Sequence, residues 1–93
     1  MAALSDEDVS AALAQRPGWA RAGDEIVRVY EPGSFRAVID LVDGIADAAE
    51  AADHHPDLDI RYNKLRVALS THDQGGITAK DFALADQIDD LAG

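Results

Sequence analysis

The sequence predicts an α+β domain, a small four-stranded antiparallel sheet with its helices packed on one face. Two features of the sequence support this prediction. Residues 57–62 and 65–71 alternate polar and apolar side chains, which is typical of paired strands that each bury one face. Residues 35–53 instead repeat their apolar side chains at helical spacing. The expected order along the chain is helix, strand, strand, helix, strand, strand, helix.

The first helix is expected to begin after Ser5. Ser5 and Asp8 have the spacing of a capping box, and the acidic residues between them suit the positive end of a helix. Val9 and Leu13 give the helix a weak apolar side, and Pro17-Gly18 is expected to end it. The first helix should therefore be short.

A strand and a long helix follow. The chain should turn at Gly23-Asp24, and residues 25–30 then have the β-branched content of a strand. Trp19, the only tryptophan, is expected to fill the core before this turn. Ser34 can cap the helix of residues 35–53.

The long helix should bury a single apolar stripe against the rest of the domain. The side chains of this stripe are Phe35, Val38, Ile39, Val42, Ile45, Ala46 and Ala49. Gly44 lies inside the same helix, where glycine costs roughly 1 kcal/mol relative to alanine. We expect this glycine to allow close packing against the sheet.

A hairpin and a last helix complete the predicted fold. Asn63-Lys64 forms the short polar link between the two alternating segments. Gly75-Gly76 then turns the chain, and Thr78 with Asp81 has the spacing of a capping box at the start of the final helix. The expected inward side of this helix consists of Phe82, Leu84, Ala85, Ile88 and Leu91.

Length and composition indicate one globular domain, residues 1–93. A chain of 93 residues can bury a single modest core, and its 47% hydrophobic and 28% charged residues are typical of a folded protein. A free sheet edge or an uncovered sheet face in such a small domain favours association with a second copy. We therefore expect a homo-oligomer.

Charge and residue usage exclude several classes of protein. The net charge of −10 should repel nucleic-acid phosphates and anionic membranes. Without cysteine the chain has neither disulfides nor a catalytic thiol, which is compatible with a reducing cytoplasm. The first residues lack the basic and apolar regions of a signal peptide, and no run of about 18 apolar residues occurs. We expect a cytoplasmic protein with no direct nucleic-acid or membrane partner.

All three histidines fall within one stretch of the sequence, and histidine exchanges protons near neutrality because its unperturbed pKa is about 6.5. Glu50 precedes His54 by four residues, so a helix that reaches His54 would let this carboxylate orient the imidazole. Pro56 should stop the helix and hold His54 and His55 at a corner. Because a hairpin returns the chain to its start, His72 should come back near this pair.

Several kinds of site are compatible with this cluster. Acid–base catalysis of a dehydration fits best, because imidazoles can both deliver and accept protons near neutrality. A nucleophilic triad is disfavoured because no oxyanion loop accompanies Ser70. No metal is expected, because neighbouring histidines rarely both bind one ion and no other zinc motif is present. The His-His pair is also compatible with a solvated helix end.

The spacing of these residues resembles a family signature. The pattern runs Glu50, three residues, His54-His55-Pro56, five residues, Tyr62, nine residues, His72, eight residues and Asp81. Together with the runs Tyr62-Asn63-Lys64 and Leu69-Ser70-Thr71-His72, it resembles the pterin-4a-carbinolamine dehydratases. The likeness extends more loosely from Trp19 to Leu91.

This resemblance implies that the protein has the same fold and forms a dimer or tetramer. It also implies that the protein is a lyase, 4a-hydroxytetrahydrobiopterin dehydratase. Such a hydro-lyase converts a 4a-hydroxytetrahydropterin to quinonoid dihydropterin in tetrahydrobiopterin recycling, with the pterin as substrate and no cofactor. The resemblance implies that His54, His55 and His72 are catalytic. We expect His55 to be the main proton-transfer group, while His54 and His72 position or protonate the leaving hydroxyl. The alternative is a non-catalytic dimerisation cofactor, or an assembly or scaffold protein, of the same fold.

The resemblance also implies a set of supporting residues. The expected substrate-binding residues are Trp19, Glu50, Pro56, Ser70, Thr71 and Asp73. Asp81 completes the signature and is also expected to cap the last helix. Leu58 and Asp59 stand where the family commonly has aromatic residues, and alternation along a strand allows only one of them to face the pocket.

Overall fold

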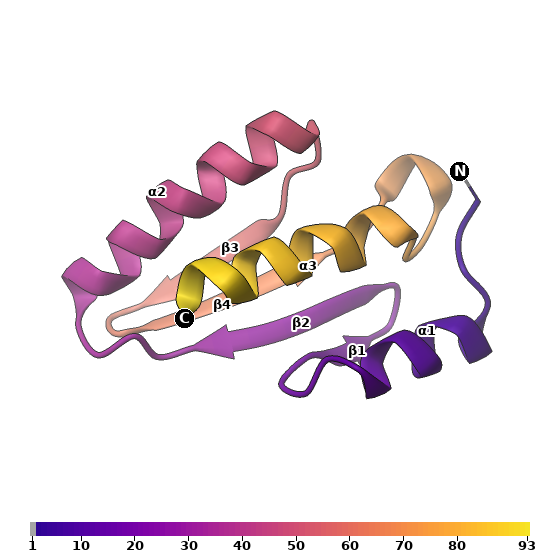
Figure 1. Cartoon of the computed structure of the whole chain (residues 1–93), viewed down its shortest axis with the longest axis horizontal. Coiled ribbons are helices and arrows are strands. Elements are labelled where there is room, and N and C mark those ends of the chain that lie inside the picture. The colour runs from indigo at the N-terminus through magenta and orange to yellow at the C-terminus, as the bar shows by residue number, and fades with distance from the viewer. Residues whose placement is uncertain (1) are drawn as a thin grey trace.

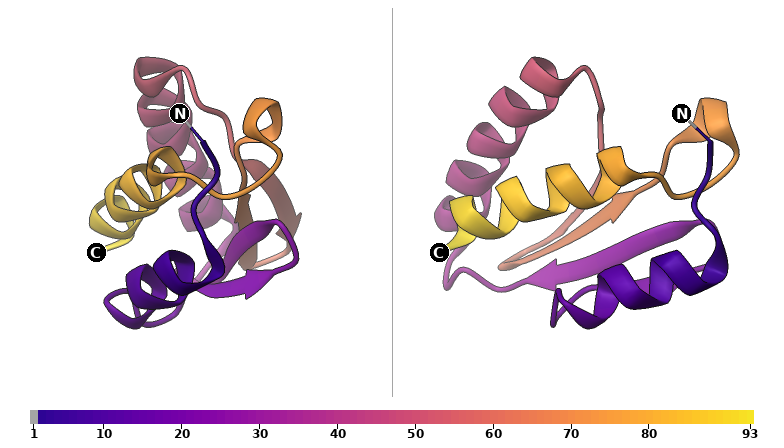
Figure 2. Two further views of the ribbon diagram at one scale, coloured as in Figure 1. Left: turned by 90° about the vertical axis from the view of Figure 1, so that its right-hand side faces the viewer. Right: turned by 45° about the vertical axis from the view of Figure 1, so that its right-hand side comes forward.

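The computed structural model describes residues 2–93, so that Met1, the first residue of the predicted domain, lies outside the described residues. Three helices lie on one side of a four-stranded sheet, as Figures 1 and 2 show. The elements are α1 (Asp6–Ala14), β1 (Ala20–Ala22), β2 (Glu25–Tyr30), α2 (Phe35–Ala52), β3 (Asp57–Arg61), β4 (Lys64–Leu69), the 3-10 turn η1 (His72–Gln74) and α3 (Ala79–Ala92). The predicted α+β class and the order of helices and strands are confirmed.

The sheet has the strand order β1-β2-β4-β3, and every neighbouring pair is antiparallel. The two central strands, β2 and β4, place Ile26 opposite Leu69 and Tyr30 opposite Leu65. These four side chains are 0–7% exposed because they face the helices. β1 and β3 form the two edges, and all five residues of β3 are exposed.

The buried face of α2 is rotated from the predicted stripe. Val38 and Ile45 are buried as expected, but Leu41, which the prediction left out, is also buried. Phe35 is 51% exposed, and Ala46 is exposed as well. The reason is that α2 packs mainly against α3, so that its buried face turns toward that helix. Helical spacing alone could not indicate which flank α3 would cover.

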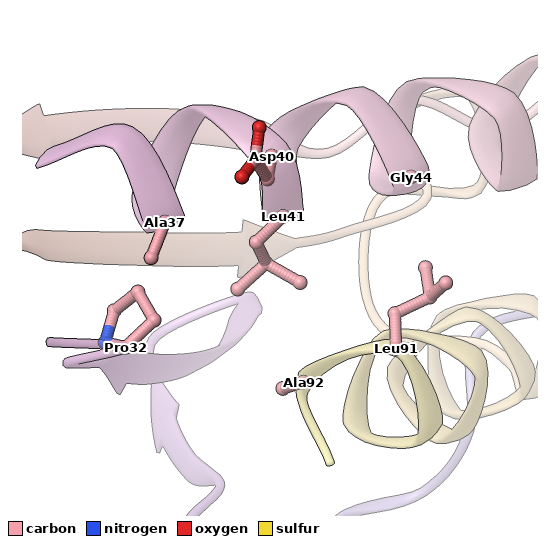
Figure 3. Close-up of a pocket in the computed structure, with 7 residues that line it drawn as sticks. All are labelled: Pro32, Ala37, Asp40, Leu41, Gly44, Leu91 and Ala92. Atoms are coloured by element: carbon pink, nitrogen blue, oxygen red, sulfur yellow. The ribbon is translucent and has the colours of Figure 1, made fainter. Parts of the chain in front are cut away.

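Gly44 faces α3 rather than the sheet, which corrects the prediction. A Cβ atom at Gly44 would lie 3.2 Å from Cδ2 of Leu91, and Figure 3 shows the Leu91 side chain rising from α3 toward Gly44. Leu91 is itself 48% exposed and not inward-facing as expected, because it lies in the last turn of α3 beside an open hollow of about 240 Å³. The glycine therefore allows close approach of two helices.

Several element boundaries differ from the prediction by one or two residues. The hairpin turns at Tyr62-Asn63, where Tyr62 adopts the left-handed conformation with φ of 51°. β4 ends at Leu69, so that His72 begins a 3-10 turn instead of ending a strand. α2 ends at Ala52, because Asp53 adopts a left-handed C-cap conformation with φ of 49°.

The side chain of Trp19 contacts both β2 and α3. Its indole Nε1 donates to both carboxylate oxygens of Asp89, at 3.1 and 3.0 Å, and its ring meets Tyr30 edge to face. Arg28 donates to the same carboxylate at 3.0 Å, and so does the Tyr30 hydroxyl. Burial, followed by the hydrogen bond to Asp89, raises the pKa of Tyr30 far above its usual value. Trp19 is only 5% exposed, which agrees with its predicted place in the core.

None of the helices across residues 2–93 is both long and apolar enough to cross a membrane.

We predict that Gly44→Ala stabilises the protein by about 0.5–1 kcal/mol, because alanine loses less backbone entropy in a helix. The new methyl group would press on Leu91, but this side chain is half exposed and can move. Thermal unfolding should show a Tm higher by a few degrees. The same change in a Leu91→Ala background should show at least this gain, and a lower Tm in both backgrounds would contradict the prediction.

Candidate active site

The ends of α2 and β4 and the start of α3 lie together at one end of the molecule (Figure 1). α2 stops because Asp53 takes the left-handed conformation and its N–H bonds to the carbonyl of Glu50 at 3.3 Å. The N–H of His54 then bonds back to the carbonyl of Ala49 at 3.1 Å. The left-handed residue therefore reverses the chain and sends His54 and His55 in different directions from the helix end.

His54 points inward, where it meets Asp81. Its Nε2 lies 2.5 Å from Oδ1 of Asp81, and the two side chains are 10% and 0% exposed. The other oxygen of Asp81 accepts the backbone N–H of Thr78 and the hydroxyl of Thr71, both at 2.9 Å. An ionised carboxylate can only accept hydrogen bonds, so His54 carries a proton on Nε2 and leaves Nδ1 for other contacts.

Asp81 therefore serves both the fold and the site. It completes the capping box with Thr78 that begins α3, as the sequence predicted. The Thr71 hydroxyl also lies 2.7 Å from the Thr78 hydroxyl, so that the end of β4 joins the same buried network. Sequence reasoning did not foresee that this carboxylate would hold His54.

His55 points outward and pairs with Glu50. Its Nε2 lies 2.5 Å from Oε2 of Glu50, and the two side chains are 56% and 77% exposed. The sequence predicted that Glu50 would orient His54, and this is wrong. The prediction assumed a helix that continues to His54, whereas the left-handed Asp53 ends it and folds His55 back over the last turn of α2.

The three histidines line one open hollow of about 400 Å³, which confirms that the hairpin brings His72 back to the His54-His55 pair. His72 reaches the hollow from the 3-10 turn, which the bridge between Thr71 and Gly76 closes. The lining residues are Asp53, His54, His55, Ser70, Thr71, His72, Asp73 and Lys80. Two of them, Asp53 and Lys80, were not predicted, although Lys80 follows the Thr78 cap by two residues.

A second hollow of about 330 Å³ lies on the other side of His55. Its lining residues are Ile45, Ala46, Ala49, Glu50, His55, Pro56 and Leu58. Glu50 and Pro56, predicted as substrate-binding residues, border this second hollow and not the first. Leu58 borders the second hollow too. Because side chains alternate along a strand, Asp59 faces the opposite side of the sheet, where its carboxylate accepts a hydrogen bond from Nε of Arg61 at 3.2 Å.

Trp19 does not join the other predicted site residues. It lines neither hollow beside His55, and its indole is bound to Asp89, near the end of α3 opposite to Asp81. Across residues 2–93, no three His, Cys, Asp or Glu side chains gather in a way that would hold a metal ion. The arrangement therefore offers proton donors and acceptors: three imidazoles, two of them bonded to carboxylates, beside a polar hollow that also contains one ammonium group.

Comparison with known proteins gives consistent results along the whole chain. A family model described as pterin 4 alpha carbinolamine dehydratase matches residues 2–91. A relative from Chloroflexus aurantiacus, whose name places it in this family, is 53% identical over 93 residues, covering 100% of both chains. A relative from Nocardia farcinica with the same family name is 54% identical over 89 residues, covering 96% of this chain and 94% of its own.

Two solved structures share the fold. The crystal structure of a transcriptional coactivator/pterin dehydratase from Brucella melitensis has a TM-score of 0.94 at 29% identity and covers 98% of this chain and 99% of its own. A pterin dehydratase-like protein, described as a RuBisCO assembly factor in the alpha-carboxysome, has a TM-score of 0.71 at 21% identity and covers 84% and 93%. The second likeness concerns the fold alone. With a family model that matches residues 2–91 and relatives about half identical over their whole length, this chain belongs to the pterin-4a-carbinolamine dehydratase family.

Proposed function

We propose that this protein is a hydro-lyase that dehydrates 4a-hydroxytetrahydropterins to quinonoid dihydropterins. The observation that carries the proposal is the convergence of His54, His55 and His72 on one hollow, with two of the imidazoles bonded to carboxylates. The pterin is the substrate, and the reaction proposed here needs no cofactor. Family membership supports the same activity, which serves tetrahydrobiopterin recycling.

The reaction requires two proton movements. The C4a–O bond breaks and the hydroxyl leaves as water after it receives a proton, while N5 loses its proton and a C4a=N5 double bond forms. An imidazolium can supply the first proton and a neutral imidazole can accept the second, and each such step contributes roughly 10²–10⁴-fold to the rate. Histidine is suited to both tasks because its unperturbed pKa of about 6.5 lies near neutrality.

The environments of the histidines suggest how these tasks are divided. His55 is half exposed and bonded to Glu50, which orients its ring toward incoming substrate and stabilises the imidazolium that forms when it accepts the N5 proton. His54 is nearly buried and held by Asp81, so it presents Nδ1 in a fixed position. His54 and His72 then position or protonate the leaving hydroxyl.

The remaining residues of the hollow suit the polar edge of a pterin. The pyrimidine ring of a pterin carries an amino group, a ring N–H and a carbonyl. The carboxylates of Asp53 and Asp73 can accept the N–H groups, and Ser70 and Lys80 can donate to the carbonyl. The buried His54–Asp81 pair would serve the fold of a scaffold as well, but the fold has no need of the exposed His55–Glu50 pair and of His72 beside such a hollow, so the geometry favours the enzyme over the non-catalytic alternative.

We also propose that the protein forms a homo-oligomer through β3. This edge strand is exposed along its whole length, and its apolar residue Ile60 is 37% exposed. If two copies of β3 pair antiparallel about Ile60, Asp59 of each copy lies opposite Arg61 of the other. Opposite charges in directly facing positions stabilise a strand pair, and pairing removes the unpaired edge.

We predict that His55→Ala slows dehydration of freshly generated 4a-hydroxytetrahydropterin by roughly 10²-fold or more, because the proton acceptor at N5 is lost. The fold should persist, because the His55 side chain is 56% exposed. The rate of quinonoid dihydropterin formation above the buffer reaction measures the effect, and circular dichroism checks the fold.

A suitable control is Asp57→Ala, an exposed residue one position beyond Pro56 that lines neither hollow. It should keep the wild-type rate. Equal rates for His55→Ala and the wild type would contradict the assignment of His55 as the proton acceptor.

The same assay is run with EDTA, because the proposed proton transfers need no metal and the rate should not change. Activity that EDTA abolishes and zinc restores would assign the site to metal chemistry.

We predict a solution mass of at least twice the 9.9 kDa monomer at micromolar concentration, measured by light scattering. Ile60→Lys should lower this mass, because it places two ammonium groups at the centre of the proposed pair. Val29→Lys is the matched control, since Val29 is an exposed apolar residue of the central strand β2. A monomeric wild type, or equal effects of both changes, would argue against pairing through β3.

A further inference from the structure

His72 differs from the other two histidines of the hollow in how its side chain is held. His54 and His55 are each bonded to a carboxylate. Within residues 2–93, by contrast, no side chain forms a hydrogen bond to the imidazole of His72, which is exposed. The backbone of the loop that carries His72 must therefore set the position of this imidazole.

This loop, residues 71–77, is closed by backbone hydrogen bonds. The N–H of Thr71 donates to the carbonyl of Gly76 at 2.9 Å, and the N–H of Gly75 donates to the carbonyl of His72 at 3.1 Å. Gly75 turns the chain in the left-handed conformation, with φ of 70°. The position of His72 thus depends on where the returning arm of the loop, residues 76–77, is held.

The chain before α1 contacts this returning arm. The N–H of Leu4 donates to the carbonyl of Ile77 at 2.8 Å. A Cβ atom at Gly76 would lie 3.3 Å from Cβ of Ala3, so the two segments are in close contact. Figures 1 and 2 show the first described residues running from α1 to the loop that precedes α3.

Other contacts hold this first segment in place, so that it can support the loop. The side chain of Leu4 packs against the hydrophobic core. Ser5 accepts the N–H of Asp8 at 3.1 Å and so begins α1, whose Val9 is only 1% exposed. The segment is therefore tied to the core and to α1 on one side and to Ile77 on the other.

We infer that Ala3 and Leu4 are positioning residues for His72. They hold the returning arm of the loop and thereby keep the His72 imidazole at the substrate hollow, although neither of them lines it. This inference rests on the proposed dehydratase function and adds to it a support outside the hollow. Such a support matters because a misplacement of about 1 Å in a catalytic group can lower a rate by up to 10²-fold.

The test removes one backbone hydrogen bond. Leu4→Pro deletes the N–H that the carbonyl of Ile77 accepts. Leu4→Ala is the matched control, because it also removes the leucine side chain but keeps the N–H. Exchange of the Thr71 and Gly75 amide hydrogens with solvent reports opening of the loop. Steady-state rates with the 4a-carbinolamine report catalysis by the same three proteins, the two variants and the wild type.

In Leu4→Pro, the Thr71 and Gly75 amides should exchange roughly fivefold faster or more than in Leu4→Ala, because the returning arm has lost its hydrogen bond. The kcat of Leu4→Pro should fall by roughly threefold or more, with KM within about twofold of the wild type. This split is expected because His72 acts on the leaving hydroxyl in the transition state. Leu4→Ala should keep kcat within about twofold of the wild type.

A second comparison separates positioning from general damage to the fold. His72→Ala should retain a measurable rate, because His55 is the main proton-transfer group in the proposed function. In this background Leu4→Pro should lower kcat no further, because the imidazole that the loop positions is gone. Unchanged amide exchange in Leu4→Pro, or the same loss of kcat with and without His72, would overturn the inference. A wild type inactive on the carbinolamine would overturn the proposed function, and the exchange rates alone would then decide whether residues 3–4 hold the loop.

Discussion

The buried carboxylate of Asp81 is the constraint on which both the fold and the site depend. Its side chain is 0% exposed, and an ionised group taken out of water is tolerated only where hydrogen bonds replace its hydration. Those bonds come from the backbone N–H of Thr78, the hydroxyl of Thr71 and Nε2 of His54. The start of α3, the end of β4 and the end of α2 must therefore meet at one point for the chain to fold.

This meeting point explains why one imidazole is rigid and its neighbour is accessible. His54 satisfies the buried carboxylate and is 10% exposed, whereas His55 pairs with the surface carboxylate of Glu50 and is 56% exposed. The left-handed Asp53 separates the two directions. In the function proposed above, this fixed imidazole and its solvent-accessible neighbour would be the two proton-transfer partners that dehydration of a carbinolamine requires.

The period-two pattern of the hairpin and the helical spacing of α2 were sufficient to predict the fold class and the convergence of the three histidines. The hydrogen-bond partners of those histidines depend on the local backbone conformation at the end of α2. One left-handed residue, Asp53, determines that Glu50 meets His55 instead of His54, and local spacing does not reveal it. Trp19 was placed near the substrate by family resemblance alone, yet its indole is bound by Asp89, a contact between residues 70 positions apart in the sequence.

The measurement that tests this account most directly is the tautomer of His54, read from two-bond ¹⁵N–¹H NMR couplings in the wild type and in Asp81→Asn. In the wild type, His54 should carry its proton on Nε2, because the carboxylate can only accept. In Asp81→Asn the amide oxygen should keep the bonds from Thr78 and Thr71, so that the amide N–H₂ donates to Nε2 of His54 and the proton moves to Nδ1. The same tautomer in both proteins would contradict the claim that Asp81 sets the reactive atom of His54.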